Sequence, residues 1–270
     1  MPRPLTLVLV LLTAPLAWGQ ASAPDGREGR STHGGAPPIR AAAVAAERAV
    51  EDAPLFYVVG ERAAIHTDPG SARTLGRLDF REGIHVLEER DGWSRVEHDG
   101  RRGWVRSDAL SNVWILIDKE SRYLYVYRGT ELVRKLPADV SQNPNGDKVR
   151  RSVLGESDHY RIPEGVFFIT SKNTQSQYYR SLMLNYPNEE HAERGLREGI
   201  ITRAEYQQIV SASRNFRSPP MGTRLGGAIA IHGQGSGRQR AWTRGCVALR
   251  DVHMDAIWDL VEVGTPVLVR

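Results

Sequence analysis

The only cysteine of the chain, Cys246, is the residue best able to do covalent chemistry. A thiol attacks as its thiolate, and a nearby imidazole can accept the proton that the thiol loses. His232 precedes Cys246 by fourteen residues in the stretch AIAIHGQGSGRQRAWTRGCVALRD. These two residue types in one stretch predict a cysteine nucleophile with a histidine base. A buried, inert cysteine is the alternative that these residues alone leave open.

Short elements around the pair are expected to bring the two side chains together. Residues 228–232 form an apolar run that predicts a strand ending at His232, and the glycines after it let the intervening loop fold back. Gly245 allows a tight backbone just before the sulfur. We therefore expect the backbone amides of Gly245 and Cys246 to form an oxyanion hole.

The N-terminus indicates export, which bears on the meaning of a lone thiol. Arg3 precedes an apolar run over 5–18 that is too short to span a bilayer, and small residues follow. We expect a signal peptide over 1–19, a flexible linker rich in Ala, Gly and Pro over 20–54, and no stable membrane insertion after cleavage; an uncleaved anchor is the alternative. In the periplasm or at the cell-wall exterior, Cys246 is then either an intermolecular link or a reactive thiol.

Composition and charge narrow the classes of partner. The formal net charge of +4 suits an anionic partner such as a cell wall. The chain lacks an aromatic–basic motif, so we expect no nucleic acid as a partner. The GQGSG run lacks the Gly-Lys-Ser/Thr of a phosphate loop, and only His232, Cys246 and His253 are close enough in sequence to be metal ligands. We therefore expect neither a metal nor a cofactor.

The region 113–270 is predicted to be mostly β with a few helices. VWILIDK and YLYVYR predict paired strands, GVFFIT at 165–170 another strand, and PVLVR a closing strand. Residues 188–215 mix charged and apolar side chains at helical spacing, which predicts a helical insertion. Asp251 is expected to cap a helix that Gly264 ends. The apolar face of this helix comprises Met254, Ile257, Trp258 and Val261.

Residues 55–112 predict a small β barrel instead. Asp91-Gly92 and Asp99-Gly100 are hairpin signals between runs of alternating apolar and polar residues. The segment resembles the bacterial SH3-like domains, most clearly in its closing GWVRSDAL. That resemblance implies either binding of cell-wall peptides or positioning of a neighbouring catalytic domain, and both remain open.

The thiol-bearing region resembles the catalytic motif of the YkuD-type L,D-transpeptidases. That family has a histidine in an IHG strand end, a spacer of comparable length and then Ser/Thr-X-Gly-Cys, and IHGQGSGRQRAWTRGC matches this at His232 and Cys246. NPNGDK, IPEGVFFI and LNYPN match as well, so the resemblance covers 113–270 and is closest to the branch with Trp-Thr-X-Gly-Cys. It implies a β-rich YkuD-like catalytic domain with a helical insertion.

Two positions depart from the commonest family pattern. Arg244 stands where the family usually has a histidine, and Ala248 stands where it often has an arginine. A permanent positive charge at Arg244 is expected to favour the thiolate and to steer a substrate carboxylate; a solvated charge is the alternative. Besides Arg244, the residues expected at the substrate site are Gly233, Trp242, Thr243 and Tyr186.

The reaction that the resemblance implies is acyl transfer at a peptidoglycan stem peptide. Cys246 attacks the carbonyl of the third residue, forms a thioester and expels the terminal D-alanine, while His232 takes the thiol proton and gives it to the leaving amine. An amine of another stem peptide, or of a wall-linked protein, then resolves the thioester. Resolution by water, as in a carboxypeptidase or a cross-link-cleaving amidase, is one alternative. A non-catalytic wall-binding protein is another.

Overall fold

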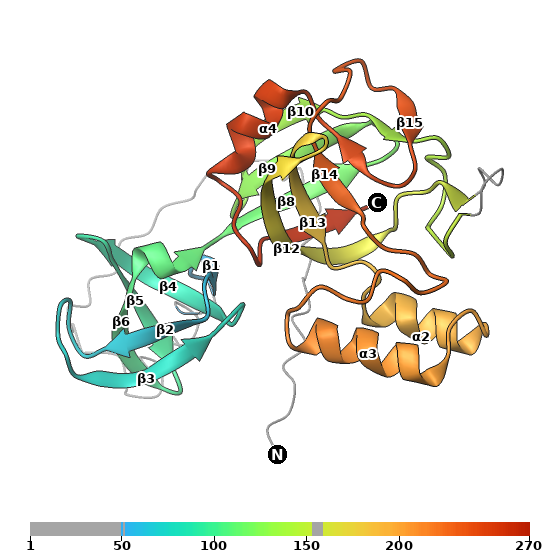
Figure 1. The fold of residues 1–270 in the computed structure, drawn as a ribbon. Helices are drawn as coiled ribbons and strands as arrows, with labels where there is room; N and C mark the ends of the chain where they lie inside the picture. The colour runs from blue at the N-terminus through green and yellow to red at the C-terminus, as the bar shows by residue number, and fades with distance from the viewer. Residues whose placement is uncertain (1–49, 51, 153–158) are drawn as a thin grey trace, which may run out of the picture. The chain divides into compact units, whose positions relative to one another are not determined.

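The computed structural model describes residues 50, 52–152 and 159–270 of the 270-residue chain. The expected signal peptide over 1–19 lies outside the described residues, as does nearly all of the expected linker over 20–54. Within the described part, no helix is long and apolar enough to cross a membrane. The described chain is mostly β, as the sequence predicts (Figure 1).

The first strands form a small antiparallel barrel. Every second side chain is buried, as in Ala63 and Ile65, because one face of each strand packs on the barrel interior. The order of neighbouring strands is β3-β2-β6-β5-β4-β1-β7. Their bounds are β1 (Leu55–Val58), β2 (Arg62–His66), β3 (Thr74–Asp79), β4 (Gly83–Arg90), β5 (Trp93–His98), β6 (Arg101–Arg106) and β7 (Leu110–Ser111), with a 3-10 turn η1 (Ser107–Ala109) before β7.

Both Asp-Gly pairs form the hairpin turns that the sequence predicts. Asp91 and Gly92 have φ angles of 51° and 77°, and Asp99 and Gly100 have φ angles of 49° and 69°. Positive φ at both central residues matches the twist of the flanking strands. Across these turns β4 pairs with β5, and β5 pairs with β6, both antiparallel.

The second part of the chain is built on an eight-stranded mixed sheet. Its order is β10-β9-β8-β17-β12-β13-β14-β16, and a separate parallel pair joins β11 to β15. The two strands predicted from VWILIDK and YLYVYR are paired antiparallel, as expected. The bounds are β8 (Val113–Asp118), β9 (Tyr123–Arg128), β10 (Glu131–Pro137), β11 (Val140–Ser141), β12 (Gly165–Ser176), β13 (Tyr179–Leu184), β14 (Ala230–His232), β15 (Ala241–Thr243), β16 (Val247–Ala248) and β17 (Pro266–Val269).

Burial of apolar side chains on this sheet holds the second part together. Each fully buried Leu, Ile or Phe contributes about 1.5–3 kcal/mol relative to an exposed one. The largest fully buried side chains of this core are those of Tyr186, Phe167, Ile115, Ile117, Leu124, Ile162, Ile169, Leu182 and Leu184. This packing fixes the strands that carry the thiol and the imidazole.

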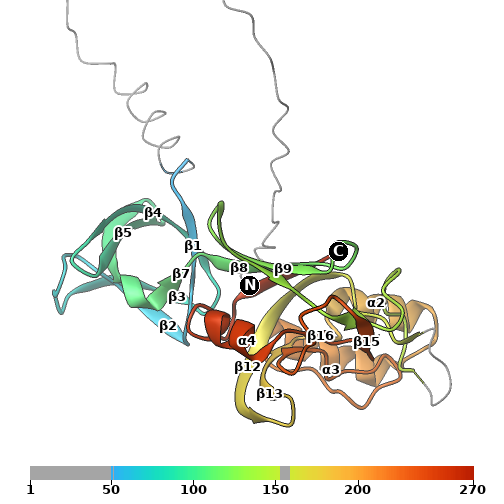
Figure 2. The same ribbon diagram turned by 90° about the horizontal axis from the view of Figure 1, so that it is seen from above.

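The helical insertion predicted over 188–215 consists of two helices. Asn188 caps α2 (Glu189–Arg197) by accepting from the backbone N–H of His191, and Thr202 caps α3 (Arg203–Arg214) in a reciprocal capping box with Glu205. The two helices pack on one another around a small apolar core. Figure 1 and Figure 2 show the pair apart from the third helix, α4 (Asp251–Trp258).

The ends of α4 differ from the expectation. Arg250 is its N-terminal cap residue and makes no capping hydrogen bond from its side chain, while Asp251 is the first helical residue. The Asp251 carboxylate instead accepts from the backbone N–H of Gln234 at 2.7 Å. An acid in the first turn still suits the helix dipole, so the sequence signal was displaced by one residue. The helix ends at Trp258, well before Gly264.

Candidate active site

Two neighbouring strands bring His232 and Cys246 together. β14 and β16 run parallel, with His232 opposite Ala248. Cys246 immediately precedes β16 and stands two residues before Ala248 along the shared direction. A strand spacing of about 4.8 Å and two steps of about 3.3 Å put the two Cα atoms about 8 Å apart.

The His232 ring is held as a base. Its Nδ1 lies 2.7 Å from the carbonyl oxygen of Gly233. A carbonyl only accepts, so Nδ1 carries the proton and Nε2 keeps its lone pair. The ring is 3% exposed and stacks on Tyr178, with centroids 4.5 Å apart. Burial lowers the pKa of His232, which the Gly233 carbonyl and the charge of Asp139 partly oppose.

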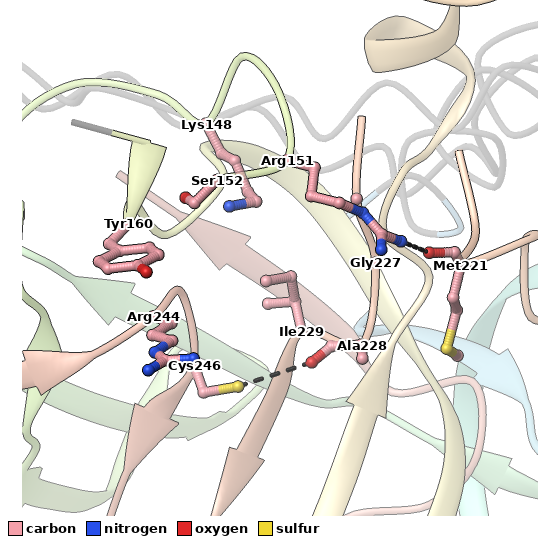
Figure 3. Close-up of a pocket in the computed structure, with 11 residues that line it drawn as sticks. Lys148, Arg151, Ser152, Tyr160, Met221, Gly227, Ala228, Ile229, Arg244 and Cys246 are labelled. Carbon is pink, nitrogen blue, oxygen red and sulfur yellow. Dashed lines mark hydrogen bonds between the residues drawn. The ribbon is translucent and has the colours of Figure 1, made fainter. Parts of the chain in front are cut away.

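The Cys246 sulfur rests against the backbone of the preceding strand segment. Its Sγ donates to the carbonyl oxygen of Ala228 at 3.6 Å (Figure 3). Burial raises the pKa of the Cys246 thiol, while a hydrogen bond with the Ala230 backbone and the charge of Lys148 act to lower it. Lys148 therefore has the electrostatic role toward the thiol that the sequence led us to expect of Arg244.

The turn before the nucleophile requires glycine at position 245. Gly245 has a φ of 135°, and a Cβ there would lie 2.9 Å from both the carbonyl oxygen of Arg161 and the Ile229 side chain. The Thr243 hydroxyl donates to the carbonyl oxygen of Cys246 at 2.6 Å and accepts from the Gly245 N–H at 3.4 Å. These two bonds of Thr243 shape the turn.

Asp139 braces the loop between the two reactive residues. Its carboxylate accepts from the N–H and hydroxyl of Ser236, from the N–H of Arg240 and from the Trp242 indole, each within 2.9 Å. Its backbone also pairs with that of Ala248 in both directions. The side chain is fully buried, yet these donors hold the pKa of Asp139 below its ordinary value.

A cavity of about 440 Å³ opens beside Cys246. Lys148 and Arg151 reach it from one loop and Arg244 from the turn before Cys246, and Figure 3 shows Lys148 across the cavity from the sulfur. Among its described lining residues none is acidic. The guanidinium of Arg244 lies over the Tyr160 ring, 5.4 Å from its centroid. The candidate site is therefore a thiol at the wall of a cationic cavity.

The other residues expected at the substrate site lie in three different surroundings. Arg244 lines the cavity. Gly233 and Trp242 lie at the His232 ring, Gly233 as its acceptor and Trp242 edge-on at 6.2 Å. Tyr186 is fully buried and its hydroxyl donates to the carbonyl of Leu225, so it belongs to the core and does not reach the cavity. That expectation is corrected, because a motif position alone does not reveal burial.

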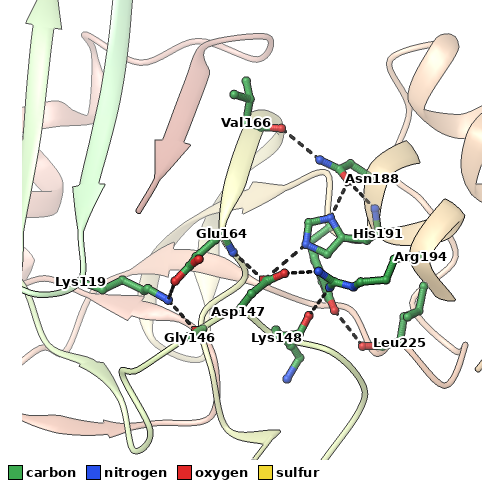
Figure 4. Close-up of polar contacts among 11 residues, drawn as sticks. Lys119, Gly146, Asp147, Lys148, Glu164, Val166, Asn188, His191, Arg194 and Leu225 are labelled. Atoms are coloured by element: carbon green, nitrogen blue, oxygen red, sulfur yellow. Dashed lines mark hydrogen bonds and ion pairs between the residues drawn. The ribbon is translucent and has the colours of Figure 1, made fainter. Parts of the chain in front are cut away.

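The loop that carries Lys148 is fixed by a charged network (Figure 4). The Asp147 carboxylate pairs with Arg194 of α2, accepts from the N–H of Glu164 at 2.8 Å and lies 3.6 Å from the His191 ring. Arg194 also donates to the carbonyl of Lys148 at 2.8 Å. These bonds anchor the loop on the helical insertion, and they hold the pKa of Asp147 well below its ordinary value against the effect of burial.

Sequence reasoning missed Lys148 and Arg151 as cavity residues. The NPNGDK segment that ends at Lys148 was recognised only as a family match. Nothing in its composition signals that the loop crosses to the thiol 98 positions later in the chain.

Two family models match the chain. The model described as the L,D-transpeptidase catalytic domain matches residues 112–269, and the model described as the bacterial SH3 domain matches residues 61–111. Among curated proteins no match is found.

Solved structures of similar proteins include three from different bacteria. Bd1075 of Bdellovibrio bacteriovorus is 23% identical over 60% of this chain and 49% of its own, with a TM-score of 0.40. An L,D-transpeptidase of Mycobacterium smegmatis is 13% identical over 83% and 85%, with a TM-score of 0.37. The E. faecium L,D-transpeptidase catalytic domain acylated by ertapenem is 13% identical over 59% and 98%, with a TM-score of 0.34. This chain spans about half the length of the Bdellovibrio protein.

Proposed function

Because this chain belongs to the family of L,D-transpeptidase catalytic domains, we propose that it is a cysteine acyltransferase that acts on peptidoglycan stem peptides in cell-wall biogenesis. The observation that carries the proposal is the parallel pairing of β14 and β16. The pairing puts His232, whose Nδ1 carries the ring proton, on the strand beside the segment of Cys246, and Cys246 lines a cationic cavity. The cations suit the carboxylates of a stem peptide.

In the first half-reaction a thioester forms and an amine leaves. Proton transfer requires Sγ to exchange the carbonyl of Ala228 for Nε2 of His232, a rearrangement that substrate binding commonly brings about. The sulfur then adds to the scissile carbonyl, the C–N bond breaks, and His232 gives its proton to the departing amine. No net charge is created, so a buried imidazole can perform both transfers.

The oxyanion of the tetrahedral intermediate needs an unoccupied donor. The Gly245 N–H is already directed to the Thr243 hydroxyl. The Cys246 N–H makes no backbone hydrogen bond among those of the described residues. We assign the oxyanion contact first to Cys246 N–H, with Gly245 joining when its 3.4 Å bond to Thr243 opens.

In the second half-reaction an amine of another stem peptide, or of a wall-linked protein, attacks the thioester and regenerates the thiol. The enzyme would work outside the cytoplasm, after cleavage of the signal peptide over 1–19, and would contribute to cell shape. The barrel over 55–112 would bind the wall or position the catalytic region over 113–270.

The test is mass spectrometry of purified sacculi after incubation with the protein. New 3–3 cross-links with release of D-alanine are expected, together with an acyl adduct on Cys246 in the intact protein. Cys246→Ala should give neither. Trimming of tetrapeptides to tripeptides without new cross-links would show that water resolves the thioester. If the protein is folded and its thiol can be labelled, but no cross-link, D-alanine or tripeptide forms, the protein binds the wall without catalysis.

A carbapenem provides a second test that needs no wall. The E. faecium relative is described as acylated by ertapenem. An activated thiol at Cys246 should open the strained lactam in the same way and gain the mass of the drug. Absence of this adduct, under conditions in which iodoacetamide labels Cys246, would contradict the assignment of an activated nucleophile.

A further inference from the structure

Lys148 is a buried cation that faces the cavity of Cys246, and it has no anionic partner among the described residues. The residue is 4% exposed, and its Nζ donates to the carbonyl oxygen of His159 at 2.8 Å. Asp147 beside it is already held by Arg194 and His191. Among the described residues no carboxylate forms a salt bridge with the Lys148 ammonium. Two of its three donor positions are left for the cavity.

Lys119 is a second buried lysine, and its charge is paired within the protein. It is also 4% exposed and donates to the same loop, at the carbonyl of Gly146. Its ammonium, however, has a carboxylate partner, Glu164, at 2.6 Å. The two lysines therefore share burial and contact with one loop, and among the described residues only Lys119 has a carboxylate partner.

An unpaired buried ammonium is costly, and proteins retain such groups where a partner arrives later. Burial lowers the pKa of Lys148 to about 8, which still leaves it mostly charged at neutral pH. Arg151 and Arg244 line the same cavity, and the Arg151 guanidinium is fixed by a bond to the Met221 carbonyl. Three cations around one cavity make it a site for an anion.

The position of the ammonium limits where this anion lies in a substrate. Lys148 and Cys246 are on opposite walls of one cavity of about 440 Å³, which holds only a few residues of a peptide (Figure 3). A peptide carbonyl held at the sulfur therefore places its immediate neighbours at Lys148.

We infer that Lys148 is a specificity-determining residue that binds a free carboxylate next to the scissile amide of the acyl donor. The inference rests on the proposed function and names a feature of its substrate. A stem peptide offers two such carboxylates, that of the terminal residue and that on the side chain of the diamino acid. Either forms a charge-assisted bond with an ammonium, and substrate analogues separate them.

Binding to the Cys246→Ala variant isolates recognition from chemistry. Three peptides are compared by calorimetry: a stem tetrapeptide with a free C-terminal acid, its C-terminal carboxamide, and an analogue with lysine in place of diaminopimelate. With Lys148 present, one of the two analogues should bind at least tenfold more weakly than the tetrapeptide. With Lys148→Met added, the ratio of the Kd of this analogue to the Kd of the tetrapeptide should fall toward one. Lys148→Arg should restore part of the ratio.

Lys119→Met is the matched control, because it removes an equally buried lysine that contacts the same loop. It should leave the ratio unchanged, and circular dichroism should show that all variants are folded. Equal binding of all three peptides, or a ratio that survives Lys148→Met, would overturn the inference. So would a Lys148→Met variant whose only change is a higher alkylation midpoint for Cys246, since Lys148 would then serve the thiolate alone.

Failure of the proposed function would look different. A wild-type protein that forms no thioester and releases no D-alanine would refute the acyltransferase, whatever the binding ratios. A wild-type protein that turns over normally, with a ratio independent of Lys148, would refute only the carboxylate contact.

Discussion

Burial shifts the pKa values of Cys246 and His232 so that the uncharged form of each side chain is favoured. It raises the pKa of Cys246 and lowers that of His232. The resting pair is therefore a thiol and a neutral imidazole, not a thiolate and an imidazolium. We expect the rate of alkylation by iodoacetamide to rise with a midpoint above about 8.5, the ordinary value for cysteine. The rate measured across a pH series checks this, and a midpoint near pH 5 would indicate a preformed ion pair.

The same argument sets the acid limit of activity. His232 must be neutral to accept the thiol proton. Because burial lowers its pKa, the ring stays neutral as the pH falls past about 6.5, the ordinary pKa of histidine. The acid limb of kcat/KM should therefore lie below that value. A limb above pH 7 would mean that a different group is the base.

Arg244 contributes a charge to the cavity without touching the sulfur. We expect Arg244→Ala to lower kcat/KM about tenfold, mainly through KM, because a charge-assisted contact to substrate is worth about 1.5–3 kcal/mol at most. Steady-state kinetics on a soluble muropeptide measures this. Arg238→Ala, which removes an exposed arginine from the loop between the reactive residues, is the control and should change little.

Among the elements, the turn before the nucleophile tolerates the least change. Gly245→Ala would place a Cβ 2.9 Å from two neighbours in a region of φ that side chains avoid. Displacing the turn by about an ångström should lower kcat/KM by about a hundredfold. Gly222→Ala is the control, since a Cβ there meets nothing within 4 Å. Equal kinetics for the two variants would show that the turn accommodates a Cβ at position 245.

The loop braced by Asp139 should show its stabilisation in the pH dependence of unfolding. The native pKa of Asp139 is depressed, so its contribution is present above its unfolded pKa of about 4 and is lost as the pH falls through the native value. Asp139→Asn should cost about 1–3 kcal/mol in urea unfolding at pH 7, and less near pH 3. Asp255→Asn, at a half-exposed pair with Arg180, should cost under about 1 kcal/mol. A cost for Asp139→Asn that does not shrink in acid would contradict this account.

Sequence patterns predicted these elements where the cause is local. Alternation marked the strands, and Asp91-Gly92 and Asp99-Gly100 marked turns that need positive φ. The motif around Cys246 pointed to the residues that the sheet brings together. Lys148 and Asp139 were not found, because their roles depend on loops that close over distant strands, and Tyr186 was misplaced because burial is a property of the whole packing.

For the molecule as a whole, the residues of the proposed site all follow the barrel in sequence. Deletion of 55–112 should therefore leave turnover of a soluble muropeptide largely unchanged while weakening action on intact sacculi. It should also lower Tm, because the barrel residue Tyr57 donates to the carbonyl of Val113 and Arg81 donates to that of Gly264. Turnover, sacculus pull-down and thermal melts test this. Arg81→Ala should lower Tm alone, and loss of soluble activity in a folded truncation would show that the barrel completes the site.

The edge of the large sheet beside Cys246 affects self-association of the protein. The nucleophile adjoins β16, a two-residue strand at the border of the large sheet, and such borders invite pairing with strands of other molecules. The backbone of Asp139 occupies the hydrogen-bonding positions of Ala248 on that border. Asp139 thereby covers this edge of the sheet and keeps it from pairing with another copy of the chain. A variant that breaks the backbone pairing of Asp139 with Ala248 would expose this edge of the sheet. Such a variant would self-associate as well as lose activity.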